Sequence, residues 1–109
     1  MWFPELSRSR LRTIVGDEAA RGFAIERLAP LRRLTADSGD IPLSTLAAWL
    51  GCHGVVDRAA VRLGVHRHTV TARLTRIRSI LEVDLDDPDT RTELWLALKW
   101  QGQGLASSD

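Results

Sequence analysis

The sequence has few of the features that mark secreted or membrane proteins. Its one cysteine, Cys52, cannot form a disulfide within the chain, and a single thiol fits a reducing cytoplasm. No stretch approaches the ~18 apolar residues of a membrane span. The first four residues lack the basic segment and long apolar segment of a secretory signal. The sequence therefore predicts a cytoplasmic protein with no membrane partner.

Patterns for catalysis and for metal binding are also missing. No nucleophile is paired with a base, no carboxylate dyad stands out, and there is no glycine-rich phosphate loop. Neither Cys52-His53 nor His66-x-His68 has the paired spacing of a structural zinc site. The acids of residues 84–89 lack the glycine of a calcium loop and fit helix capping better. We expect no enzyme activity, no metal and no cofactor.

Hydrophobic spacing predicts an all-α fold. The 109 residues suit one small domain, and apolar residues recur at three- and four-residue intervals with little that indicates strands. The pattern predicts a small helical domain of five or six helices, containing a helix-turn-helix. Turn residues place these helices near residues 5–15, 17–28, 42–52, 55–63, 67–81 and 88–100.

Proline and glycine define the predicted helix ends. Pro30 should end or restart the second helix, and residues 35–42 have the composition of a loop. Asp87-Pro88-Asp89 combines a capping acid with proline at the first helical position, which predicts a strong helix start. Gly102 and Gly104 should end the last helix.

Charge is divided unevenly along a chain whose formal net charge is only +1. Residues 58–78 hold six arginines and no acid, whereas residues 82–93 hold six acids and one arginine. Such a division indicates a surface that faces a polyanion. A solvated helix face beside an acidic loop would produce the same division, so charge alone leaves both interpretations open.

Residues 56–77, VDRAAVRLGVHRHTVTARLTRI, have the pattern of two helices joined by a tight turn. Ala60 is small where two helices must cross closely, and Gly64 stands where the turn needs a left-handed residue. Two-helix corners also occur in proteins that do not bind DNA. The apolar spacing directs both helices into one core through Leu63, Val65, Val70, Leu74 and Ile77.

The second of these helices, at about residues 67–80, is the predicted recognition helix for the major groove of double-stranded DNA. Arg67 can bond guanine bidentately or hold a phosphate, and Thr69 and Thr71 can donate to phosphate or touch a thymine methyl. The competing interpretations are a surface salt bridge for Arg67, a local backbone contact for Thr69 and an internal ion pair for Arg73. The predicted DNA contacts are His66, Arg67, His68, Thr69, Thr71, Arg73, Thr75 and Arg76.

Several segments of residues 17–101, in order and spacing, resemble the C-terminal domain of PucR-type (CdaR-like) bacterial regulators. They are Thr45–Leu50, Leu63–Val70, Arg73–Ile77, Leu85–Pro88 and Leu94–Leu98. The helix-turn-helix also resembles that of the Fis protein. The resemblance implies a DNA-binding output domain of a transcriptional regulator, in which Arg67 and Thr69 match the family's Arg-x-Thr motif.

The chain departs from the family pattern at both motif helices. Val55 and Asp57 stand where similar sequences often have Asn and Ser, and Asp57 places a negative charge near the expected phosphate. Thr71 and Ala72 stand where relatives often carry arginine and an aromatic or basic residue. Weaker binding, or an unusual target preference, is expected from these differences.

The resemblance also implies a division of the chain. Residues 1–16 would form the junction to an upstream sensor domain, residues 17–101 the helix-turn-helix domain, and residues 102–109 a flexible tail. The last helix is apolar on more than one side, which predicts an interface with a second copy or with the sensor domain, through Trp95, Leu96 and Trp100. The alternative is a helical protein-interaction or oligomerisation module that uses this helix, for which six unopposed arginines would be unnecessary.

Overall fold

The computed structural model describes residue 11 and residues 13–106, and these contain no strand. The all-α prediction is therefore confirmed. Residues 1–10 and 107–109, which the sequence assigned to the junction and the tail, lie outside the described residues. None of the described helices is long and apolar enough to cross a membrane. The main helices are α2 (Asp17–Ser38), α3 (Ile41–Gly51), α4 (Val56–Leu63), α5 (Arg67–Leu81) and α6 (Pro88–Ala106).

The helix α2 is one continuous helix of 22 residues with Pro30 inside it, so the predicted break at this proline was wrong. A proline in a helix interior costs about 3 kcal/mol because it removes a backbone hydrogen bond. Leu28 and Leu31 lie on either side of it, and both are fully buried. Burying each leucine stabilises the fold by roughly 1.5–3 kcal/mol, which offsets that cost.

The loop predicted for residues 35–42 was also wrong, because α2 continues to Ser38 and only Gly39 and Asp40 separate it from α3. Gly39 has a φ of +66°, a left-handed conformation that glycine adopts without strain. Ser44 then donates its backbone N–H to the Asp40 carbonyl at 2.8 Å and its hydroxyl to the same oxygen at 2.9 Å. This short turn makes α2 and α3 close neighbours.

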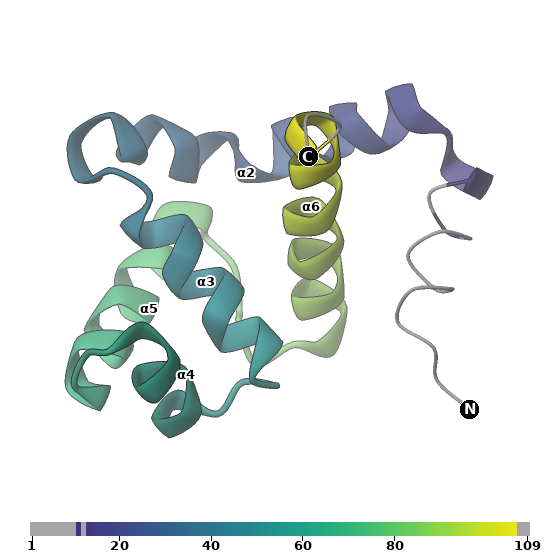
Figure 1. Ribbon diagram of the computed structural model, residues 1–109. Coiled ribbons are helices and arrows are strands. Elements are labelled where there is room, and N and C mark those ends of the chain that lie inside the picture. The colour runs from purple at the N-terminus through teal and green to yellow at the C-terminus, as the bar shows by residue number, and fades with distance from the viewer. Residues whose placement is uncertain (1–10, 12, 107–109) are drawn as a thin grey trace, which may run out of the picture.

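The most extensive helix contact joins α2 to α6, the first and last helices of Figure 1. Trp100 is only 4% exposed and meets the Phe23 ring edge-on, with 5.7 Å between ring centroids. Arg27 and Glu93 form an ion pair at 3.2 Å across the same contact. Packing within the chain therefore accounts for much of the apolar character of α6.

The sequence analysis predicted where α6 begins and ends, and only the predicted start is correct. Asp87 caps the helix as predicted, because its carboxylate accepts the Thr90 backbone N–H at 2.9 Å and the Thr90 hydroxyl at 3.0 Å. The predicted end was wrong, since α6 continues past Gly102 and Gly104 to Ala106. Each glycine costs a helix about 1 kcal/mol but does not forbid it.

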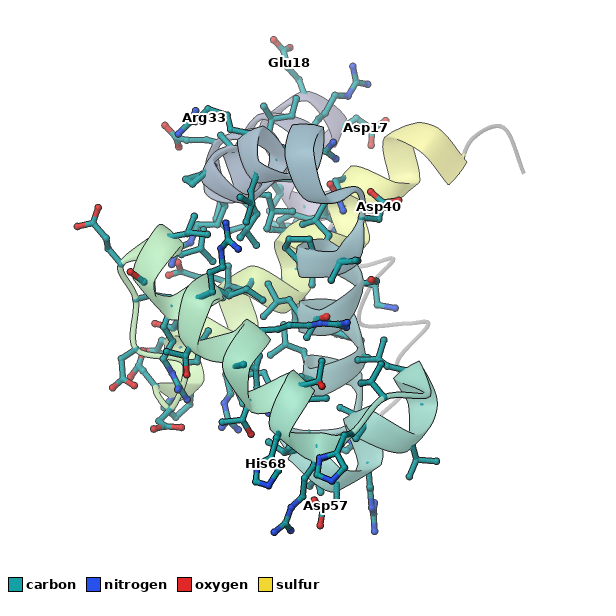
Figure 2. All side chains as sticks on the ribbon, turned by 90° about the vertical axis from the view of Figure 1, so that its left-hand side faces the viewer. Asp17, Glu18, Arg33, Asp40, Asp57 and His68 are labelled. Carbon is teal, nitrogen blue, oxygen red and sulfur yellow. The ribbon has the colours of Figure 1, made fainter. Side chains whose placement is uncertain are left out.

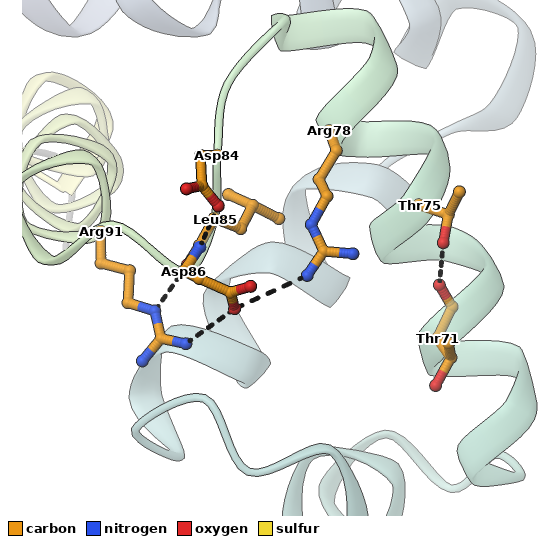
Figure 3. A network of polar contacts seen from close by, with 7 residues as sticks. All are labelled: Thr71, Thr75, Arg78, Asp84, Leu85, Asp86 and Arg91. Carbon is orange, nitrogen blue, oxygen red and sulfur yellow. Dashed lines mark hydrogen bonds and ion pairs between the residues drawn. The ribbon is translucent and has the colours of Figure 1, made fainter.

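Arg91 ties α6 to the segment that follows α5 (Figure 3). Its Nε donates to the Leu85 carbonyl at 2.6 Å, and its guanidinium lies 4.6 Å from the centroid of the Trp49 ring in α3. Asp86 Oδ1 lies 3.7 Å from Arg91 Nη2 and 3.9 Å from Arg78 Nη2 of α5. These five residues, which we call the Arg91 junction, hold α6 to the helices of the motif.

Candidate nucleic-acid interface

The helices α4 and α5 form the predicted two-helix corner. Gly64 ends α4 with φ +70° and ψ +33°, so the left-handed glycine inferred from the sequence is confirmed. The Val65 N–H donates to the Ala60 carbonyl at 3.1 Å, which closes the turn. Ala60 is 6% exposed, as expected of a small residue at a helix crossing. Both helices pack on α3, which holds the corner from behind.

The helix α5 buries one side and exposes the other. Val70, Leu74, Ile77 and Leu81 form the buried side. In Figure 2 the exposed side faces the viewer, and His68 lies near Asp57 at the end of the molecule opposite Glu18 and Arg33. We call this exposed side the outer face of α5; its residues are Arg67, His68, Thr71, Ala72, Thr75, Arg76 and Ser79.

Two members of the outer face were absent from the predicted contacts. Ala72 and Ser79 are exposed on the same side of α5 as His68 and Thr75. Residues three and four apart on a helix share a face, so the spacing 68, 72, 75 and 79 contained the signal. The sequence analysis considered Ala72 only as a position where a contact made by relatives is missing, and it did not consider Ser79.

His66 is the N-cap of α5. Its extended backbone, with φ −72° and ψ +149°, lets Nδ1 accept the His68 backbone N–H at 3.1 Å. The two imidazole rings stack with 4.8 Å between centroids. His66 thus satisfies one of the free N–H groups at the helix start, a role usually taken by Ser, Thr, Asp or Asn. Its Nδ1 is occupied by the helix, whereas His68 remains on the outer face.

Arg67, the first residue of α5, faces Asp57 in the first turn of α4. Arg67 Nη1 and Asp57 Oδ1 are 3.7 Å apart, and the two side chains are 62% and 69% exposed. An exposed pair of this kind stabilises a fold by about 0–1 kcal/mol, so the guanidinium can exchange this partner for another anion. Asp57 also offsets the unfavourable placement of a cation at the positive end of a helix.

The three predicted threonines differ in exposure. Thr69 is half-buried, whereas Thr71 and Thr75 are exposed. The Thr71 hydroxyl donates to the Arg67 carbonyl at 3.2 Å, and the Thr75 hydroxyl donates to the Thr71 carbonyl at 3.0 Å. Both hydroxyl protons are therefore directed along the helix backbone.

Arg73 and Arg76 both line a small hollow beside Ile41 and Pro42, but they differ in exposure and in bonding. Arg73 is half-buried and donates from Nη1 to the hydroxyl of fully buried Thr45 at 3.3 Å, so it faces α3. Arg76 is exposed and borders the same hollow, which has a volume of about 80 Å³. The structure brings Arg76 to the outer face with Arg67 and leaves Arg73 apart from it.

The other arginines of residues 58–78 also differ in whether their guanidinium groups contact other parts of the chain. The Arg62 guanidinium lies against Gly51 at the C-terminal end of α3, and Arg78 pairs with Asp86. Arg58 is exposed on α4. Within the described residues, no hydrogen bond or ion pair engages the side chain of Arg58 or Arg76. These two, with weakly paired Arg67, are the arginines best placed to meet an anion.

The residues predicted as a protein interface lie on α6, away from the corner. Trp100 is buried against α2, while Trp95 is half-buried with Lys99 Nζ 4.4 Å from its ring centroid. Leu96 is half-buried and packs against the core. Much of the surface expected to meet a partner is therefore covered by the chain itself.

Comparison with known proteins supports the interpretation of the corner. A family model described as the PucR C-terminal helix-turn-helix domain matches residues 43–100, which cover most of α3, all of α4 and α5, and α6 as far as Trp100. This match confirms the resemblance that the motifs indicated, to a family of regulator domains rather than of enzymes. No solved structure matches the chain significantly.

Three relatives show the extent of the similarity. An uncharacterized protein from the pkwA 5′ region of Thermomonospora curvata is 40% identical over 95 residues, covering 87% of this chain and 52% of that protein. The purine catabolism regulatory protein of Bacillus subtilis is 42% identical over 59 residues, 54% of this chain and 11% of that protein. The carbohydrate diacid regulator of Escherichia coli is 40% identical over 78 residues, 70% of this chain and 20% of that protein. The chain thus spans about half the length of the first relative and a fifth or less of the other two.

Proposed function

The chain belongs to the family of PucR C-terminal helix-turn-helix domains, and we propose that it binds double-stranded DNA sequence-specifically, with α5 in the major groove, as the output domain of a transcriptional regulator. The observation that carries the proposal is the outer face of α5, which is exposed over the whole helix while its other side is buried. A recognition helix needs this combination of a fixed position and an open polar face.

The available arginines supply the affinity for the DNA backbone. Arg58 on α4 and Arg76 on α5 present exposed guanidinium groups to phosphates on either side of the groove. The N-terminus of α5 adds the positive end of its helix dipole, which also favours phosphate. Contacts of this kind fix the position of the helix but do not distinguish one base pair from another.

Specificity comes from the beginning and the middle of α5. Arg67 gives up its weak pair with Asp57 and bonds the O6 and N7 atoms of a guanine, an exchange that the exposure of both side chains permits. His68 and Thr75 reach base edges from the same face, and Thr69 contacts phosphate at the helix start. His66 and Arg73 act through the fold, as the helix cap and as a link to α3.

A single recognition helix makes few base contacts, so we propose that two copies bind half-sites about one helical turn, roughly 34 Å, apart. We further propose that an upstream sensor domain of the regulator controls this pairing; two of the relatives are much longer than the matched segment. The alternative, an interaction module built on the apolar last helix, has less support because α2 already covers Trp100 and Leu94.

The first experiment measures binding to a pool of random duplex DNA by fluorescence anisotropy, at salt concentrations from about 50 to 300 mM. Two guanidinium contacts with phosphate per domain, from Arg58 and Arg76, predict that log K falls against log[salt] with a slope of about −2 or steeper, because each neutralised phosphate contributes about 0.9. The control is a double variant, Arg58→Ala with Arg76→Ala, which should have a slope about two units shallower. No binding at the lowest salt, at high protein concentration, would contradict the proposal.

A further inference from the structure

The recognition helix lacks the side chains that most specifically recognise adenine and cytosine. From Arg67 to Leu81, α5 contains no Asn, Gln, Asp or Glu. Asparagine and glutamine bond the N6 and N7 atoms of adenine, and carboxylates accept from the N4 of cytosine. Guanine is recognised by arginine, and thymine is recognised by apolar contact with its C5 methyl group. The base-specific contacts that α5 is best equipped to make directly are therefore with guanine, through arginine, and with thymine, through methyl groups.

The centre of the outer face offers carbon rather than hydrogen-bond donors. Thr71 and Thr75 lie one turn apart on the side of α5 away from Asp86, as Figure 3 shows. Their hydroxyls donate to the Arg67 and Thr71 carbonyls at 3.2 and 3.0 Å, so neither hydroxyl proton is available to a base. Ala72, between them in the sequence, is also exposed. Besides the acceptor lone pairs of the two hydroxyl oxygens, these three residues present methyl groups to a partner.

We propose that the methyl surface of Thr71, Ala72 and Thr75 recognises the C5 methyl groups of thymine in the major groove. The inference rests on the proposed function and adds the class of target: duplex DNA with thymines opposite the middle of α5. Small side chains suit this contact, because they let the helix backbone approach the groove floor until the methyl groups meet. Arg67, at the start of α5, then contacts a guanine to one side of these thymines.

The test uses the operator selected from a random duplex pool and a second operator in which deoxyuridine replaces the thymines. Base pairing is unchanged, and each substitution removes one methyl group from the major groove. We expect about a fourfold loss of affinity for each contacted thymine, the change that burial of one methyl group produces. Equal affinity for both operators would overturn the inference, as would a selected operator without thymine. Failure of the proposed function would be distinct, because no operator would then be bound at all.

Two substitutions at Thr75 distinguish the contribution of its methyl group to binding from that of its hydroxyl. Thr75→Ser keeps the hydroxyl and its bond to the Thr71 carbonyl but removes the methyl group. The ratio of the affinities for the thymine operator and the deoxyuridine operator should therefore shrink about fourfold. Thr75→Val keeps a methyl and removes the hydroxyl, so the difference should persist. The matched control is Thr92→Ser on α6, whose hydroxyl donates to the Pro88 carbonyl at 2.9 Å in the same geometry. An undiminished difference in a folded Thr75→Ser protein, checked by circular dichroism, would overturn the inference.

Discussion

The outer face of α5 and the Arg91 junction use the same residue type in opposite ways. On the outer face, Arg67 has one weak partner and Arg76 has none within the described residues. At the junction, Arg91 donates to a carbonyl at 2.6 Å, stacks on Trp49 and pairs with Asp86. The two regions lie on different sides of the motif, so one can exchange partners without disturbing the other.

The comparison shows that the number of arginines in a segment predicts its charge, but not whether each arginine stabilises the fold or remains available to a ligand. An arginine that bonds a backbone carbonyl, pairs with an acid and stacks on an aromatic ring, as Arg91 does, contributes to stability. An arginine on an open helix face contributes little to stability and remains available to a ligand. Substitutions in the two regions should therefore affect different measurements.

Arg91→Ala should have the largest effect on stability. It removes the hydrogen bond to the carbonyl of fully buried Leu85 and the contact with Trp49. We expect a loss of about 2 kcal/mol in the free energy of unfolding, which lowers Tm by roughly 10 °C in a domain of this size. Thermal unfolding followed by circular dichroism measures it. Arg76→Ala, the matched control, should change the free energy of unfolding by less than about 0.5 kcal/mol; equal losses in both variants would remove the distinction between the two regions.

Arg67→Ala should have little effect on stability and a large effect on DNA binding. Stability changes little, because the pair with Asp57 is exposed. Affinity for the selected operator should fall by about 1–3 kcal/mol, and discrimination should relax at one base pair. Competition binding with operators changed at single positions measures both effects. An equal loss on every sequence would instead identify Arg67 as a phosphate contact.

Asp57→Asn should have the smallest of these effects, a modest increase in affinity for DNA. It removes the carboxylate that competes with DNA for Arg67, so affinity for random duplex DNA should rise about threefold at low salt, and the gain should shrink as salt increases. Anisotropy at two salt concentrations measures it. Glu18→Gln makes the same change in net charge at the opposite end of the molecule and should leave the affinity almost unchanged (Figure 2). A similar gain in both variants would show that net charge alone is responsible.

The sequence predicted the corner and the start of α6 well because the signals for both are local. Gly64 must be left-handed for the turn, Ala60 must be small for the crossing, and Asp87 caps a helix within three residues of itself. Each of these requirements is satisfied within a few positions along the chain. The sequence failed at Pro30, where Leu28 and Leu31 on either side are fully buried in a core that residues distant in the chain help to form, and this burial outweighs the local helix-breaking tendency of proline. The helix also continues through residues 35–38, against their loop-like composition.

The candidate site was predicted in outline and not in detail. Helical spacing placed Arg67, His68 and Thr75 on one face. The spacing could not show that Arg73 reaches Thr45, because that contact joins residues 28 positions apart on two helices. Nor could it show that His66 caps α5, since histidine rarely has that role. The DNA contacts themselves stay a prediction until binding is measured.

The pairing of α2 with α6 also has a consequence for how the chain is made. About fifty residues separate the end of α2 from the start of α6, and synthesis at roughly 5–20 residues per second takes about 3–10 s to cover them. During that interval Ala24, Leu28 and Leu31 lack the helix that covers much of their face. The helices α3, α4 and α5 are neighbours in the chain and can assemble within milliseconds of emerging. All three motif helices are therefore synthesised before the helix that secures them exists.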